Sequence, residues 1–500
     1  MKPIRRAAAL AALPLILLAA AALRAWPIAD WPLWLDESWS RWLAEKDWHA
    51  LVDSTAHFDT HPPFYYSLLK LWLSVAPHTP AGMRLLSVVA GVATAGAAML
   101  CAAQVPSLRR SRPFRVAAGG LAALSPALVI AGQQARPYAL LALAFTLALG
   151  CALRIVRTGG WRWWTAYAGA LALVLWLHNL GFLFAGALGL GLLLALAAEG
   201  RLRSELRGFA LAHLAAALVW IPVLLGIIEQ RREWTAGWLR FVPNEVPQGL
   251  GLGLAGPGMG ALLVLLFAAL GIAAMARRGP ERGPLLLLVS AALAPAAMEV
   301  ALSAIVSPVF LPRTLAPSAV PLLLLAAAGL ARFRSPRERG AATFAVAMVL
   351  GLTSAALATR PAEEKWDQLG ASLSARLRPG EEVWLLPNEI ALPLRYAAPS
   401  LPARGVPAEF PAPAHPGPRY SGTRAVPGMT EADAARLVAD ARRRGVVGVW
   451  VVSRFPALFD PGGALPEALG RPGESEDSYA PLTVDHYRLA PFNEDAGTPR

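Results

Sequence analysis

The sequence predicts a mainly α-helical, polytopic transmembrane bundle of about eleven spans, followed by a small extracytoplasmic α/β domain. Three observations lead to this class. The 500 residues are 56% hydrophobic and only 16% charged, whereas soluble globular chains carry about 25% charged residues. Apolar runs of about 20 residues, the length that crosses a bilayer, recur as far as residue 359. The arginines gather in short clusters between these runs, as the positive-inside rule describes.

The order of apolar runs and basic clusters predicts the topology. The first run, of about 19 residues, is longer than a signal-peptide core, so we expect a retained first span. The predicted spans begin near Ala7, Arg84, Val116, Pro137, Trp163, Gly181, Gly208, Gly258, Pro284, Thr314 and Ala341. Basic clusters fall on one side under this count: Lys2, Arg5 and Arg6; Arg109, Arg110, Arg112 and Arg115; Arg154, Arg157 and Arg162; Arg201, Arg203 and Arg207; Arg277, Arg278 and Arg282; and Arg332, Arg334, Arg337 and Arg339. That side is predicted to be cytoplasmic, which puts the loop of residues 26–83 and the tail after Thr359 outside.

Charge and cysteine content narrow the function classes. The net charge of +13 does not indicate nucleic-acid binding, because the basic residues sit in the short loops between spans. Cys101 and Cys151 both lie inside apolar stretches, so neither a disulfide framework nor a cysteine metal site is expected. No glycine-rich phosphate loop is present, so no nucleotide cofactor is predicted.

The tail has a different pattern, and we divide the chain into a transmembrane domain of residues 1–359 and an extracytoplasmic domain of residues 360–500. A helix is predicted in PAEEKWDQLGASLSARLRPG and another in TEADAARLVADARRRG, with Thr430 as its N-cap. EEVWLLP, VVGVWVVSRF and HYRLAPF read as strands, and the proline-rich residues 399–428 as an irregular loop.

Asp36 and Glu37 follow the first span in the sequence WLDESWSRW. A carboxylate at a membrane surface can act as general base on an incoming hydroxyl group. An acidic pair at the start of an amphipathic helix also complements the helix dipole. Spacing alone favours this second, structural interpretation, so both stay open here.

Asp59-Thr60-His61-Pro62-Pro63 holds an acid and a histidine two positions apart on a stiff turn. Asp59 and His61 are therefore candidates to hold a divalent metal or a phosphate. The alternative is a capping turn, in which Asp59 or Thr60 caps the following helix and proline occupies its first turn.

Three arginines, Arg84, Arg136 and Arg313, stand at span ends on the predicted outer side, against the topology bias. Tyr138 and His178 interrupt apolar sequence on the same side. A guanidinium group pairs with phosphate in a bidentate manner, so a shared anionic ligand explains the three arginines together. For any single arginine, an ordinary lipid headgroup contact is the alternative.

These motifs resemble those of the C-type-fold membrane glycosyltransferases of glycosyltransferase family 39, which include protein O-mannosyltransferases and lipid A aminoarabinose transferases. The matching segments are DE after the first span, DTHPPFYY, MRLLSVVAG, LSPALVIAGQQARPYALLAL, SPVFLPRTLAPSAVPLLLLAAAGLA and EKWDQLGASLSARLRPGEEVWLLP. The resemblance covers most of the chain. The HPP turn with DE upstream is specific to the fold and not to any substrate.

The resemblance implies a polyprenyl-phosphate sugar donor and transfer on the outer face. Asp36 matches the first-loop aspartate taken as catalytic base, Arg84 an arginine required in the mannosyltransferase branch, and Arg313 a late arginine near the donor phosphate. Thr314 stands where the late motif usually has tyrosine. His61 stands where the aminoarabinose branch has lysine, so that branch's substrate is not implied.

The sequence thus predicts a multi-pass glycosyltransferase of the bacterial inner membrane with its active site facing the periplasm or cell exterior. We expect Asp36, Glu37 and Asp59 to be catalytic, and a lipid, glycan or protein to be the acceptor. His61, Arg84, Arg136, Tyr138, His178 and Arg313 are the expected substrate-binding residues. A divalent metal near Asp59 and His61 is an open option. The rival function is a transporter or flippase of lipid-linked sugars, which predicts internal repeats or broken helices at the membrane midplane. A non-catalytic scaffold leaves the DE and DTHPP motifs without a role.

Overall fold

The computed structural model describes residues 2–26, 28–59, 61–106, 108–109, 111–233, 240–360, 362–412, 426–476 and 478–490. It divides the chain into two compact units. The membrane unit comprises Met1–Ala29, Thr60–Ile227 and Phe241–Arg360. The tail unit comprises Asp30–Asp59, Ile228–Arg240 and Pro361–Arg500. The stretch with Asp36 and Glu37 thus groups with the tail, and the division at residues 359 and 360 stays a prediction.

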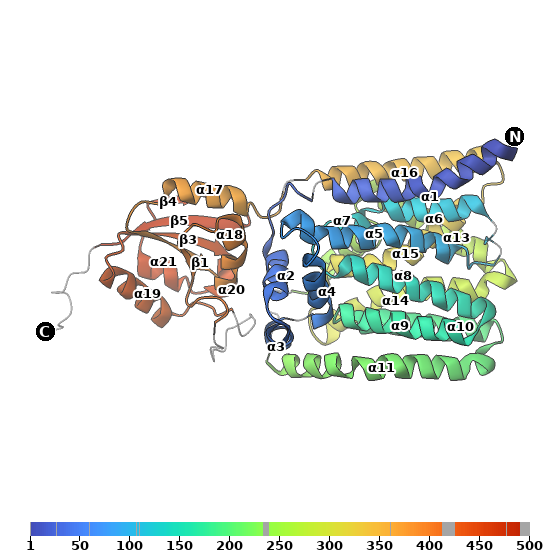
Figure 1. Cartoon of the computed structure of the whole chain (residues 1–500), viewed down its shortest axis with the longest axis horizontal. Coiled ribbons are helices and arrows are strands. Elements are labelled where there is room, and N and C mark those ends of the chain that lie inside the picture. Colours follow the sequence, from blue (N-terminus) through green and yellow to red (C-terminus); the bar gives the residue numbers. More distant parts are fainter. Residues whose placement is uncertain are drawn as a thin grey trace. The chain divides into compact units, whose positions relative to one another are not determined.

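The membrane unit is a bundle of long helices that run side by side (Figure 1). Its helices are α1 (Lys2–Ala25), α4 (Pro63–Leu73), α5 (Pro80–Ala102), α6 (Arg112–Leu124), α7 (Pro126–Gly132), α8 (Tyr138–Thr158), α9 (Trp161–Leu177), α10 (Gly181–Ala198), α11 (Leu202–Glu233), α12 (Val246–Leu254), α13 (Gly258–Ala276), α14 (Arg282–Ile305), α15 (Ala316–Leu330) and α16 (Pro336–Ala358). Its 3-10 turns are η1 (Pro243–Glu245), η2 (Gly279–Glu281) and η3 (Pro312–Leu315).

A helix lies at each of the eleven predicted span positions, and the polytopic bundle is confirmed. The number of spans stays approximate: in the part of the chain that the structure describes, eight helices are long and apolar enough to cross a membrane, or nine with the bent pair α6–α7. The described apolar part of α1 is only Ala12–Ala25. Helix α9 has 17 residues, slightly fewer than the roughly 20 that cross a bilayer.

The bundle is organised around α15, whose apolar window is 94% buried, compared with 11% for α11 and 22% for α16. Leu214 and Leu218 on α11 and Phe344 on α16 are exposed, as expected of lipid-facing helices. Glycines let α13 and α15 approach closely: a Cβ atom on Gly271 would collide with the Leu325 carbonyl group. Such small-residue contacts are the usual means of helix association in membranes.

The bent pair α6–α7 is stabilised by a buried arginine of the first helix. The two helices meet at Ser125, just before Pro126, with a bend of 55°. Proline cannot donate to the preceding turn, so carbonyl groups there lose their helical partner. Arg24 supplies donors instead, from Nη1 to the carbonyl oxygen of Ala123 at 2.9 Å and from Nη2 to that of Ala122 at 3.3 Å. The carbonyl groups at the bend are thus hydrogen-bonded by a side chain of the protein itself.

The arginine-rich loops lie together at one end of the bundle. Arg201, after α10, donates to the carbonyl oxygens of Ile155 and Val156 near the end of α8, at 2.9 and 2.6 Å. Arg157 of α8 donates to the carbonyl oxygen of Ala103, which follows α5, at 3.4 Å. Basic side chains therefore satisfy carbonyl groups at the C-termini of α5 and α8.

The tail unit is a five-stranded sheet with helices, as the strand and helix pattern predicted. Its strands are β1 (Glu381–Leu386), β2 (Ala403–Gly405), β3 (Gly448–Arg454), β4 (Glu474–Glu476) and β5 (Leu482–Arg488). Its helices and turns are α2 (Leu35–Glu45), α3 (Trp48–Phe58), α17 (Trp366–Arg376), η4 (Asn388–Ile390), α18 (Ala391–Ala397), α19 (Glu431–Arg443), α20 (Pro456–Phe459) and α21 (Ala464–Leu469). The strand order is β2-β1-β3-β5-β4, with β1 parallel to β2 and β3, and β5 antiparallel to β3 and β4.

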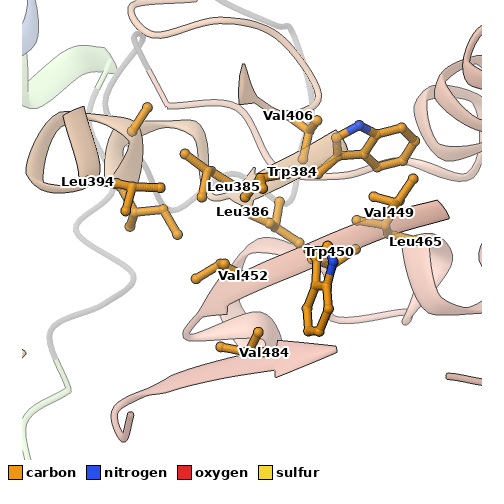
Figure 2. Packing of buried hydrophobic residues seen from close by; sticks show 14 of the residues in the cluster. Trp384, Leu385, Leu386, Leu394, Val406, Val449, Trp450, Val452, Leu465 and Val484 are labelled. Atoms are coloured by element: carbon orange, nitrogen blue, oxygen red, sulfur yellow. The ribbon is translucent and has the colours of Figure 1, made fainter. Parts of the chain in front are cut away.

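The core of the tail unit forms between this sheet and its helices. Trp384 of β1, Trp450 of β3 and Val484 of β5 are among its buried side chains (Figure 2). Thr430 caps α19 as predicted, since its hydroxyl oxygen accepts from the Asp433 backbone N–H group at 3.1 Å. The predicted irregular loop of residues 399–428 contains the short strand β2, and its residues 413–425 lie outside the described part.

Candidate functional site

The HPP turn leads into α4, with Pro63 in the first helical turn as predicted. The predicted capping by Asp59 is wrong: the N-cap of α4 is Pro62, which has no side-chain cap, and Asp59 is the C-cap residue of α3. The prolines hold the chain extended before the helix, so Asp59 is too far along the chain to serve as its cap. Thr60, the other candidate cap, lies outside the described residues.

His178 lies in the turn between α9 and α10 and is 6% exposed. Its Nδ1 atom accepts a hydrogen bond from the Leu180 backbone N–H group at 3.0 Å. Burial first, and then the neighbours His61, Arg136 and Arg313, hold the pKa of His178 well below its ordinary value. The ring is therefore neutral at pH 7 with its proton on Nε2, which makes it a hydrogen-bond donor.

Five of the predicted substrate-binding residues come together at the end of the bundle opposite the arginine-rich loops. The rings of His61 and His178 meet edge to face with centroids 4.7 Å apart, and the Tyr138 ring lies 5.7 Å from that of His178. The Arg313 guanidinium carbon lies 5.8 Å from the Tyr138 ring centre. Arg136 Nη2 lies 3.5 Å from His61 Nε2. We call His61, Arg136, Tyr138, His178 and Arg313 the arginine–histidine cluster.

The cluster is electropositive and mostly buried. Arg136 is 4% exposed, and its guanidinium group can only donate, so the His61 Nε2 atom acts as the acceptor. Two permanent cations beside a neutral histidine that donates from Nε2 match the oxygens of a phosphate group. The arrangement can bind an anion and stabilise negative charge that develops on it.

Arg84 occupies a separate position on α5. It is 2% exposed, and its Nη1 atom donates to the carbonyl oxygen of Ile28 at 2.8 Å. Ser87, one turn further along α5, lies with its hydroxyl 3.5 Å from the carbonyl oxygen of Arg136. Arg84 therefore links the residues after α1 to α5, one helical turn before the residue that lies next to Arg136. A contact of Arg84 with substrate stays a prediction.

The segment that carries Arg313 is fastened by two side chains that the sequence reading passed over. Glu299 on α14 is fully buried, and its Oε1 atom accepts from the Leu311 N–H group at 3.1 Å and lies 2.6 Å from the Thr314 hydroxyl. Ser303, one turn later, accepts from the N–H groups of Val309 and Phe310 at 3.0 and 2.8 Å. A lone glutamate inside the apolar run AAMEVALSAI was the signal that could have found it.

The three predicted catalytic acids lie in the tail unit. Asp36 and Glu37 occupy the first turn of α2, as the helix-start interpretation predicted. Glu37 is fully buried, whereas Asp36 is only partly buried. Asp59 is partly buried at the end of α3. Of the pair, Asp36 is thus the acid whose side chain reaches solvent.

The donor set of the cluster fits an anion better than a divalent cation. Among the described residues, no group of three or more His, Cys, Asp or Glu side chains is arranged to hold a metal ion. His178 Nδ1 and His61 Nε2 already accept hydrogen bonds, and Arg136 and Arg313 repel a cation. A metal at Asp59 stays a prediction.

By overall fold the chain is similar to ArnT from Cupriavidus metallidurans. The apo crystal structure has a TM-score of 0.64 at 16% identity and covers 99% of this chain and 100% of that one. The structure bound to undecaprenyl phosphate has a TM-score of 0.63 at 15% identity and covers 97% and 99%. The Archaeoglobus fulgidus oligosaccharyltransferase in complex with Zn and sulfate has a TM-score of 0.55 at 13% identity and covers 93% and 71%. No protein-family model and no curated protein sequence matches.

These likenesses show the fold. The chain is a multi-pass membrane protein with the C-type fold of the membrane glycosyltransferases, as its motifs predicted. The likeness to ArnT extends over 99% of this chain in the apo form and 97% in the form bound to undecaprenyl phosphate.

Proposed function

We propose that the protein is a glycosyltransferase that moves a sugar from a polyprenyl-phosphate donor to an acceptor hydroxyl group on the extracytoplasmic face of the bacterial inner membrane. The observation that carries the proposal is the arginine–histidine cluster, a mostly buried set of cationic and hydrogen-bonding side chains at the end of the bundle opposite the arginine-rich loops. Support comes from the shared fold with a protein that has been crystallised with undecaprenyl phosphate.

In this mechanism the Asp36 carboxylate takes the proton of the acceptor hydroxyl group. The acceptor oxygen then forms a bond to the anomeric carbon as the bond from that carbon to the phosphate oxygen breaks. Arg136 and Arg313 stabilise the charge on the departing polyprenyl phosphate, and His178 donates from Nε2. One base and one good leaving group are consistent with a single displacement that inverts the anomeric centre.

The rival function, transport of lipid-linked sugars, would use unwound helix ends to bind its cargo. The bent pair α6–α7 is the feature that speaks for it. However, Arg24 occupies the carbonyl groups of Ala122 and Ala123 at that bend, and Ser354 donates to that of Leu124 at 2.8 Å. These carbonyl groups at the bend already have partners, so we favour the enzyme.

The test has two parts. Mass spectrometry of lipid co-purified with the protein identifies the sugar carried on polyprenyl phosphate, which then serves as donor in a transfer assay. Asp36→Asn, which keeps the size of the side chain but accepts no proton, should lower turnover by roughly 10²–10⁴-fold while undecaprenyl phosphate still binds. Asp53→Asn, an exposed acid on α3, is the matched control. Wild-type turnover in Asp36→Asn would remove Asp36 as the base.

If Glu37→Gln is the inactive variant instead, the mechanism stands and Glu37 is the base in place of Asp36. We also propose that the acceptor is a lipid, a glycan or a protein. The division of the chain into domains between residues 359 and 360 is part of the same proposal.

A further inference from the structure

The first turn of α2, which carries Asp36 and Glu37, is held by a residue more than 300 positions away. The N-cap of α2 is Trp34, which makes no side-chain cap hydrogen bond. Instead the backbone N–H group of Leu35 donates to Glu364 Oε2 at 3.0 Å. The first N–H groups of a helix have no partner within the helix, and a carboxylate placed there also complements the helix dipole. Glu364 therefore does the work of an N-cap from a distant part of the chain.

Glu364 is itself held rigidly. It is 3% exposed, and its Oε2 atom also accepts from Trp366 Nε1 at 2.7 Å. Its Oε1 atom accepts from Arg454 Nε and lies 2.9 Å from Arg454 Nη2, a two-point contact of guanidinium with carboxylate. Arg454 is the last residue of β3. The sheet thus fixes Arg454, Arg454 fixes Glu364, and Glu364 fixes the peptide group next to Asp36.

A second contact prevents α2 from rotating about this anchor. Trp39, one turn after Asp36, donates from Nε1 to Glu389 Oε2 at 3.0 Å. Its ring packs edge to face on Phe410 at 4.8 Å and on Trp42 at 5.4 Å. Residues three apart on a helix share a face, so fixing Trp39 also fixes the direction in which the helix presents Asp36.

We propose that Glu364, fixed by Arg454, is a positioning residue that sets the location of Asp36 for proton abstraction. The inference rests on the proposed function, because positioning has meaning only if Asp36 is the base. The competing view is that Glu364 only stabilises the tail unit. The two differ in what happens to turnover when the Leu35 hydrogen bond is lost and the sheet stays folded.

Glu364→Gln is the informative variant. Both oxygens of Glu364 accept hydrogen bonds, so the NH2 group of a glutamine meets donors in either orientation: turned toward Leu35 and Trp366 it removes the Leu35 hydrogen bond, and turned toward Arg454 it removes the contact that fixes the side chain. Glu363→Gln is the matched control, since Glu363 is the exposed neighbour. Hydrogen exchange of the full-length protein, read on peptides over residues 33–40 and over β3 and β5, is measured together with kcat and KM for the donor.

We expect exchange in residues 33–40 to rise on the order of tenfold in Glu364→Gln. We expect kcat to fall on the order of 10–100-fold, since a small misplacement of a catalytic group has costs of this size, with the donor KM within about twofold. Glu363→Gln should match the wild type. If Glu364→Gln also raises exchange in β3 and β5, Arg454→Lys replaces it as the test. This variant keeps the charge but loses the two-point contact, and we expect smaller changes in the same direction, with faster exchange in residues 33–40 and a lower kcat.

Unchanged exchange in residues 33–40 overturns the anchor. Faster exchange there with wild-type kcat, in a protein that Asp36→Asn inactivates, overturns the positioning role. Wild-type turnover in Asp36→Asn would contradict the proposed base and not the anchor. Hydrogen exchange in residues 33–40 of Glu364→Gln would then still test whether Glu364 anchors α2.

Discussion

Replacing Glu299 tests how the segment that carries Arg313 is held. In Glu299→Ala, the Leu311 N–H group loses its acceptor, whereas the Thr314 hydroxyl can turn to the carbonyl oxygen of Leu311, also at 2.6 Å. One buried donor without a partner costs about 1–3 kcal/mol, and the small cavity adds roughly 1 kcal/mol. The expected loss of stability is therefore about 2–4 kcal/mol. Glu299→Gln keeps an amide oxygen in place and should cost less than about 1 kcal/mol.

The segment between Leu311 and Thr314 contains Arg313, so greater mobility of this segment should also lower the affinity for the donor phosphate. Thermal unfolding of the purified variants, with and without undecaprenyl phosphate, measures both effects. We expect Glu299→Ala to bind the lipid on the order of tenfold more weakly, which corresponds to about 1.4 kcal/mol. Glu299→Gln should stay within about threefold of the wild type. A Glu299→Ala variant with wild-type melting and wild-type affinity would refute this reasoning.

Three further predictions concern the donor site, the topology and the tail unit. Arg136→Ala and Arg313→Ala should each weaken binding of undecaprenyl phosphate with the fold intact. Lysine at either position should restore binding only partly, because it lacks the bidentate fork of arginine. Unchanged affinity in both alanine variants would mean that the two arginines make only lipid headgroup contacts. Cysteine at exposed Ser478 should react with a membrane-impermeant reagent in intact cells, whereas cysteine at exposed Ser204 in an arginine-rich loop should be protected, and the reverse pattern would invert the topology. Burial, the largest cause, raises the pKa of Glu389 from 4.5 to about 7, so the folded state holds this proton more tightly than the unfolded state. The stabilisation of about 3 kcal/mol at most is present below pH 4.5 and is lost as pH rises through about 7, and Glu389→Gln should flatten this part of a melting series between pH 5 and 8.

Much of the architecture could be read from the sequence because the signals are local. Apolar runs predicted where the bundle helices lie, and Thr430 with its acidic first turn marked the start of α19. The candidate residues His61, Arg136 and His178 were found because polar side chains are conspicuous at the ends of apolar runs. The parity of the spans assigned them to one side, and the structure brings these three together.

The tertiary structure decided what depends on partners far away in the chain. Arg24 looks like an ordinary basic residue at a span end, yet its partners at the bent pair lie 98 and 99 residues away. Glu364 caps α2 across 329 residues. The cluster geometry, the fastening of the Arg313 segment by Glu299 and the grouping of residues 30–59 with the tail arise in the same way. Hydrophobic periodicity depends on neighbours within a turn or two, whereas these contacts exist only once the helices and the sheet have packed.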